Sequence, residues 1–210
     1  MSSAKNRQRQ ARERVTKMRA EQRRKERRRN ILFGVGLAVL AVLVIGGAAL
    51  YVSNRGKAQS IADVQSFSGL ARTHVTGNVH YRQNPPVGGP HNSVPLNCGI
   101  YTAPVPNVNA VHSLEHGAVW VTYRPSLPAA SVTALQSLVR SEPQHQRGHT
   151  ILSPYPGLPA PVVASAWGKQ LRLDSASDPR LPHFISVYAQ GPQTPEPGAP
   201  CSGGTGTPRP

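Results

Sequence analysis

The chain has 210 residues, a formal net charge of +15 and two cysteines. Residues 1–30 contain thirteen of the 24 Lys and Arg residues but only three of the 9 Asp and Glu residues, so most of the charge belongs to one short segment. This imbalance excludes the net charge as an argument that the whole protein binds nucleic acid. The remaining length is sufficient for one ordinary domain with a buried core.

Residues 1–30 form a basic arm without glycine or proline, and Glu13 precedes Lys17 by the four residues that support an exposed helix. Two kinds of partner suit its clustered arginines: anionic lipid headgroups and nucleic-acid phosphates. The arm has no aromatic residue for base stacking. An apolar segment follows it, and basic residues beside such a segment are expected if it spans a membrane. We therefore expect lipid contact and consider nucleic acid the weaker alternative.

Residues 31–52 contain no charged residue and no proline. At about 1.5 Å per residue, a helix of this length reaches about 33 Å, enough to cross a bilayer. A cleaved signal peptide is the alternative, but its apolar region normally has about 7–15 residues. The Lys and Arg excess before the span predicts a single-pass protein of the plasma (cytoplasmic) membrane, with its N-terminus inside and its main domain outside.

The exported part is predicted to comprise a linker (53–60), an α/β domain (61–190) and a Pro/Gly-rich tail (191–210). Hydrophobic periodicity and turn residues define the expected elements. In chain order these are a strand at 71–81, a long Pro/Gly loop at 82–107, one helical turn at 109–117, a strand at 118–123, a helix at 128–140, a strand at 150–153, a hairpin at 162–173 and a helix at 179–190. This order predicts an α/β or α+β fold with a mixed sheet and flanking helices.

Both cysteines, Cys98 and Cys201, lie in the part expected to be exported. Two cysteines in an oxidising compartment favour one disulfide, and the alternative is two free thiols, one of them a metal ligand. A bond closing a loop of about a hundred residues is worth about 4–5 kcal/mol in the chain-entropy treatment, a gain that would suit a tail with little core of its own.

The segment AVHSLEHGAVW contains the strongest candidate site. His112 and His116 are four residues apart and would share one face of a helical turn, and His91 is the expected third ligand from the long loop. His80, His74 and Glu115 are further candidates. Imidazole donors suit Zn²⁺ or Cu²⁺. We expect Glu115 to point elsewhere and to form a salt bridge or orient a ligand imidazole. Histidines that only hold loops together are the alternative.

The same segment matches H-x-x-E-H, a zinc-peptidase pattern in which the glutamate is the base. Such a pattern needs a sustained helix, whereas Gly117 and an apolar strand follow His116 at once. No G-x-S-x-G motif of a serine hydrolase occurs. These observations favour a protein that is not an enzyme, and they leave a zinc-dependent hydrolase as the third interpretation.

Several blocks in order resemble the domain of unknown function 3105 family of membrane-anchored bacterial proteins. They are PPVGGPH (85–91), NCGIY (97–101), VHSLEHGAVWVTYRP (111–125), SPYPGLPAPVVASAWG (153–168) and QGPQTPEPGAPC (190–201). The resemblance implies an anchored extracytoplasmic domain and no particular activity. The sequence therefore predicts a membrane-anchored protein that binds a transition metal through His91, His112 and His116. The alternative is a cell-envelope module that contacts a protein or polymer and uses these histidines structurally.

Overall fold

The computed structural model describes residues 46, 61–142 and 148–209. The predicted basic arm, membrane span and linker therefore lie outside the described residues, apart from Gly46. No helix in the described ranges has the length and apolar character needed to cross a membrane.

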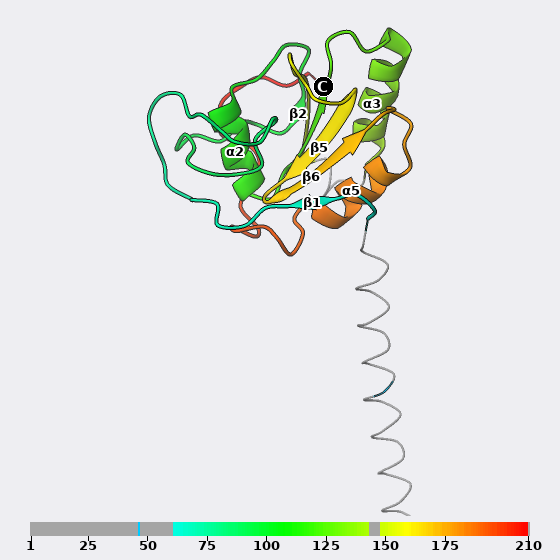
Figure 1. The fold of residues 1–210 in the computed structure, drawn as a ribbon. Coiled ribbons are helices and arrows are strands. Elements are labelled where there is room, and N and C mark those ends of the chain that lie inside the picture. Colours follow the sequence, from blue (N-terminus) through cyan, green and yellow to red (C-terminus); the bar gives the residue numbers. More distant parts are fainter. Residues whose placement is uncertain (1–45, 47–60, 143–147, 210) are drawn as a thin grey trace, which may run out of the picture. The chain divides into compact units, whose positions relative to one another are not determined.

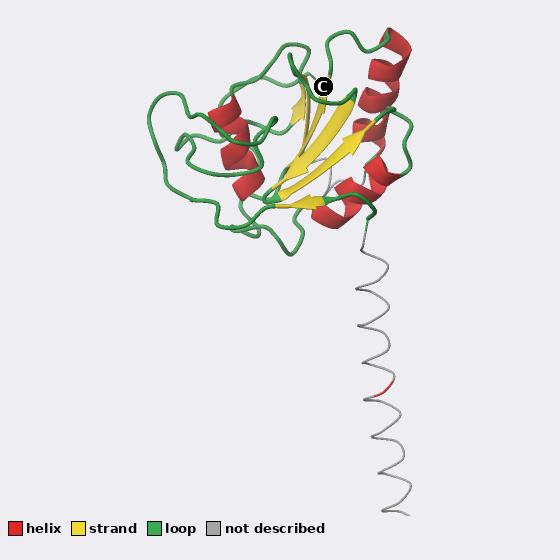
Figure 2. Ribbon diagram, viewed as in Figure 1, coloured by secondary structure: helices red, strands yellow, loops and turns green. Residues whose placement is uncertain are grey.

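A six-stranded mixed sheet forms the centre of the domain (Figures 1 and 2), in the order β1-β6-β5-β3-β4-β2. Strand β3 pairs in parallel with β4 and antiparallel with β5, and β5 forms an antiparallel hairpin with β6. The two-residue strands β1 and β2 form the edges. The strands are β1 (Gln65–Ser66), β2 (Gly99–Ile100), β3 (Val119–Tyr123), β4 (Thr150–Pro154), β5 (Val162–Ala166) and β6 (Lys169–Leu173).

Helices cover both faces of this sheet. Figure 1 shows α2 (Asn107–Glu115) on one side, and α3 (Ala129–Ser141) and α5 (Arg180–Tyr188) on the other. The side chains of β3 contribute to the core on both faces of the sheet, because successive side chains of a strand point to opposite faces. Val119 and Val121 belong to the core cluster with α3 and α5, whereas Trp120 belongs to the cluster with α2.

The prediction of a mixed α/β fold is confirmed, and so are five of its elements. The helices expected at 128–140 and 179–190 correspond to α3 and α5. The strand expected at 118–123 corresponds to β3, that at 150–153 to β4, and the hairpin to β5 and β6. In each case the apolar periodicity was sustained for several residues, which makes an element readily recognisable.

Two of the elements expected before β3 were wrong. Residues 71–81 form only an isolated bridge at His74 instead of a strand. The loop at 82–107 has no long regular element, as expected, and contains only the two-residue strand β2 before α2 begins. The single turn expected at 109–117 is the nine-residue helix α2, which follows Pro106. Asn109 does not cap it, because its side chain donates to the carbonyl of Val94 over 2.7 Å. Pro106 instead supplies the helix boundary, since proline suits the first positions of a helix.

The Pro/Gly-rich tail is held against the loop that contains β2. The amide of Asn97 donates to the carbonyl of Thr205, and the amide of Thr205 donates to the carbonyl of Pro95, each over 2.8 Å. The predicted disulfide between Cys98 and Cys201 is confirmed. Cys201 is buried in the same cluster as α2, so the tail packs on the domain rather than forming a core of its own.

We expect the double substitution Cys98→Ser, Cys201→Ser to lower the free energy of unfolding by about 4–5 kcal/mol, because the disulfide no longer restricts the unfolded chain. Urea denaturation of the full chain measures this change. Reduction of the unsubstituted chain should give a similar loss. Equal unfolding midpoints for the oxidised and the substituted chains would contradict the prediction.

Candidate metal centre

A contact between two buried ionisable side chains forms the centre of the site. His91 is fully buried and Glu115 is 2% exposed, and His91 Nε2 lies 3.0 Å from Glu115 Oε2. The other ring nitrogen, Nδ1, is 2.8 Å from the carbonyl oxygen of Gly89, to which only an N–H can donate. A neutral His91 therefore presents the lone pair of Nε2 to a carboxylate oxygen. In this neutral form Nε2 accepts no hydrogen bond from any described residue.

The second oxygen of Glu115 accepts a hydrogen bond from Arg72. Arg72 Nε lies 2.6 Å from Oε1, and this contact raises the pKa of the guanidinium. The Arg72 side chain is 49% exposed, so it neutralises part of the buried charge from the protein surface. Glu115 therefore has a permanent cationic partner on one oxygen, and its other oxygen is directed at His91 Nε2.

His112 lies on the same face of α2 as Glu115, because residues three apart on a helix are neighbours. Its Nδ1 donates to the carbonyl of Asn92 over 2.7 Å, which leaves Nε2 with a lone pair. Burial is the main cause that lowers the pKa of His112 below its ordinary value, and the neighbouring histidines act in the same direction. The neutral, metal-binding form of this imidazole is therefore favoured.

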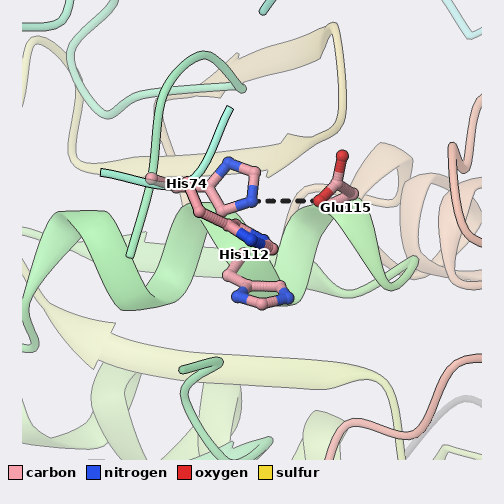
Figure 3. Close-up of side chains that lie close together, drawn as sticks. His74, His112 and Glu115 are labelled. Carbon is pink, nitrogen blue, oxygen red and sulfur yellow. Dashed lines mark ion pairs between the residues drawn. The ribbon is translucent and has the colours of Figure 1, made fainter. Parts of the chain in front are cut away.

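His74 comes from the segment before the long loop. Its backbone forms a parallel bridge with His91, in which the amide of Val75 donates to the carbonyl of His91 over 2.7 Å. The ring centres of His74 and His112 are 5.0 Å apart, and Figure 3 shows both residues near Glu115. Side chains from three separate segments thus converge.

The spacing of the three rings suits one ion. The ring centres of His74, His91 and His112 are 4.9 to 5.0 Å apart. A ring bound through one nitrogen at about 2 Å has its centre about 3 Å from the ion, so two such rings at tetrahedral angles are about 5 Å apart. One donor atom from each imidazole and one carboxylate oxygen of Glu115 all lie within 4.8 Å of one another. The set can hold a transition-metal ion.

His116 does not belong to this group of donor atoms. Its Nδ1 is 2.8 Å from the carbonyl oxygen of Pro200, and its Nε2 is 3.5 Å from Glu196 Oε2. Its ring packs edge-on against His112, with ring centres 4.5 Å apart. As the residue that caps α2, it turns toward the tail. The structure thus brings together two of the three expected ligands, His91 and His112, and places His116 beside them.

His74 and Glu115 complete the group of donor atoms in place of His116. Both were alternative candidates in the sequence, but only the length of α2 and the bridge between His74 and His91 bring them together. Glu115 points into the cluster, whereas we expected it to point elsewhere, and the expected salt bridge with a cation is formed by Arg72. His80, the remaining alternative, is exposed and outside the group.

The zinc-peptidase geometry of H-x-x-E-H is not formed. In that pattern both histidines hold the same ion and the glutamate takes a proton from water. Here His112 and His116 direct their Nε2 atoms to different surroundings. Both oxygens of Glu115 are engaged, one by Arg72 and one by His91. The arrangement therefore suits metal binding better than hydrolysis.

A family model described as "Protein of unknown function (DUF3105)" matches residues 74–203, more than half of the chain. The chain belongs to this family. The matched segment of the DUF3105 domain includes all four residues of the cluster and both cysteines. A second model, described as an inhibitor of host cell division protein domain, matches residues 8–68, a minor part of the chain. No curated protein and no solved structure matches the chain.

We expect His112 to be the neutral Nδ1–H tautomer in the metal-free protein and to stay neutral as the pH falls below about 6.5, the ordinary pKa of histidine. Burial lowers its pKa, so protonation and the loss of the neutral ring occur only at more acidic pH. Nitrogen-15 NMR of the ring measures both properties. Protonation of His112 above pH 6.5, or a proton on Nε2, would contradict this prediction.

Proposed function

We propose that the DUF3105 domain of this chain is a metal-binding domain that takes Zn²⁺ or Cu²⁺ through His74, His91, His112 and Glu115. The observation that carries the proposal is the buried Nε2 of His91, which faces a carboxylate oxygen at 3.0 Å. Two acceptors at this distance repel each other unless a positive charge lies between them. A divalent ion supplies that charge, and ligands of one ion are separated by about 3 Å.

The second nitrogens of the imidazoles support this proposal. Metal-bound histidines usually donate their other ring N–H to a carbonyl or carboxylate, which fixes the tautomer and orients the ring. The Nδ1 atoms of His91 and His112 both lie beside backbone carbonyl oxygens, at 2.8 and 2.7 Å. Both Nε2 lone pairs are therefore available without any change of tautomer. Three nitrogens and one oxygen form a donor set that suits Zn²⁺ and Cu²⁺.

A proton can replace the metal in this arrangement, and this defines the second candidate function. If His91 is doubly protonated, its Nε2–H donates to Glu115 and the pair is a buried salt bridge. The histidines then hold the long loop on α2, and the domain is a cell-envelope module that contacts a protein or polymer. The ion pair of Glu115 with Arg72 favours the metal, because Glu115 already has a cationic partner.

We expect the full chain, purified without a histidine tag, to bind one Zn²⁺ or Cu²⁺ ion. His91→Ala and His112→Ala should each weaken binding by roughly 100-fold or more, because each removes a buried ligand. His116→Ala should weaken it by about 10-fold at most, since His116 supports its neighbour rather than the ion. Calorimetric titration with each metal, supported by elemental analysis, measures these changes.

His80→Ala is the matched control, because His80 is an exposed histidine outside the cluster. It should bind metal like the unsubstituted chain. Failure of the unsubstituted chain to bind either ion more tightly than about 10 µM would favour the buried salt bridge and the envelope module.

We further propose that the domain is anchored outside the plasma membrane by residues 31–52, with residues 1–30 inside and near anionic headgroups. The uncharged span, the preceding basic arm and the disulfide support this placement, since disulfides persist in oxidising compartments. Zn²⁺ or Cu²⁺ would then bind on the outer side of the membrane.

Protease added to intact protoplasts should remove the domain that follows Ser53 and spare the basic arm. Antibodies against residues 1–30 and against the domain detect the two fragments. Disruption of the membrane before digestion provides the control, in which both parts become accessible. A domain protected in intact protoplasts would refute the orientation.

A further inference from the structure

The cluster of donor atoms has one side that faces solvent. An open pocket of about 420 Å³ is lined by His74, Val75, Thr76 and Ser93. His74 belongs both to this pocket and to the donor group, so the pocket adjoins the cluster at this residue. His91, His112 and Glu115 are all buried, and His74 alone of the four is exposed.

The side chain of His74, on the solvent-facing side of the cluster, is also held less firmly than the other three. The rings of His91 and His112 are each fixed by a backbone carbonyl, and Glu115 is fixed by Arg72. The ring of His74 contacts the rings of His91 and His112, but no described residue holds it by a hydrogen bond. A metal bound here would have three fixed ligands and one that can leave. Metal sites with three fixed protein ligands typically exchange water or another small ligand at the fourth position.

The local charge determines which ligand suits that position. Arg72 carries one positive charge, and its two partners Glu115 and Glu196 carry one negative charge each, so these three side chains have one negative charge in excess. A divalent ion converts this excess to one positive charge. A monoanion then neutralises the centre. Thr76 and Ser93 line the pocket, and their side chains carry hydroxyl groups, which can donate hydrogen bonds to an anion.

We propose that the metal has one exchangeable coordination position on the side of His74, and that a small monoanion enters through the pocket and replaces His74 there. This inference rests on the proposed metal site and specifies the class of ligand that the site takes. The lone pair of the anion forms a new bond to the ion as the bond from His74 breaks, and no electron or proton is transferred. The domain is then a receptor for a small anion as well as for a metal.

Titration of the copper-loaded full chain with azide tests the proposal, because azide bound to Cu²⁺ gives a charge-transfer absorption band. A saturable band is expected. His74→Ala should retain copper and bind azide about 10-fold more tightly, because azide no longer displaces an imidazole. Ser93→Trp fills the pocket and should weaken azide binding by about 10-fold or more, while copper affinity changes less than about threefold.

Val94→Trp serves as the matched control for bulk, since Val94 is the exposed neighbour of Ser93 outside the pocket lining. It should bind copper and azide like the unsubstituted chain. Copper binding without an azide band, or azide binding that Ser93→Trp leaves unchanged, would overturn the exchangeable position and leave the metal site standing. A chain that binds Zn²⁺ but no Cu²⁺ would overturn the anion-binding copper centre and leave the metal site standing, whereas a chain that binds neither ion would overturn both proposals.

Discussion

The buried carboxylate of Glu115 is the constraint on which the site depends. An isolated ionised carboxylate costs several kcal/mol to remove from water unless it is paired. Arg72 supplies a charge from the surface, and His91 approaches from the long loop. The backbone carbonyl of Glu115 also accepts from the amide of Glu196 in the tail, over 3.1 Å. One residue at the end of α2 thus joins three segments that are far apart in the sequence.

The tail is part of the site's support. Glu196 contacts Arg72 at 3.2 Å and lies 3.5 Å from His116 Nε2, while Pro200 accepts a hydrogen bond from His116 Nδ1. The disulfide fixes the tail five residues after Glu196. Gly117 permits this close approach: its φ is +90°, and a Cβ there would lie 2.7 Å from the Gln190 side chain. Closing the loop between the cysteines therefore also positions the residues that surround His116.

The sequence predicts the fold best where apolar residues recur over several positions. Strand β3 and helix α3 could be found because their apolar patterns are sustained. Such a pattern can be recognised within the segment itself, without knowledge of what the segment packs against. Strand β2 could not be found, because its two residues pair with β4 some fifty residues later and, at Ile100, with Arg209 in the tail. The tail likewise depends on pairing with β2 and its neighbours, which composition alone does not reveal. The membrane span remains a prediction, since it lies outside the described residues.

The sequence predicted the candidate site only in part, for a related reason. Spacing along a helix identifies residues that share a face, and this correctly singled out His112. It could not distinguish the i+3 neighbour Glu115 from the i+4 neighbour His116, because the choice depends on where α2 ends. The helix ends at Glu115, so Glu115 keeps its helical direction while His116 turns toward the tail. His74 carried no local signal, since only its bridge to His91 brings it near.

The part of the long loop around His91 is ordered before any ligand binds. The long loop has little regular structure, yet backbone hydrogen bonds hold it near His91. The amide of His91 donates to the carbonyl of Thr73, and the amide of Asn92 donates to the carbonyl of Val108 in α2. The ring of Trp167 packs edge-on against His91, with ring centres 6.1 Å apart. Ordering a loop on binding costs free energy, and a loop that is ordered beforehand avoids that cost. The side of His74 is held less firmly, so exchange of a ligand there leaves the buried half of the cluster in place.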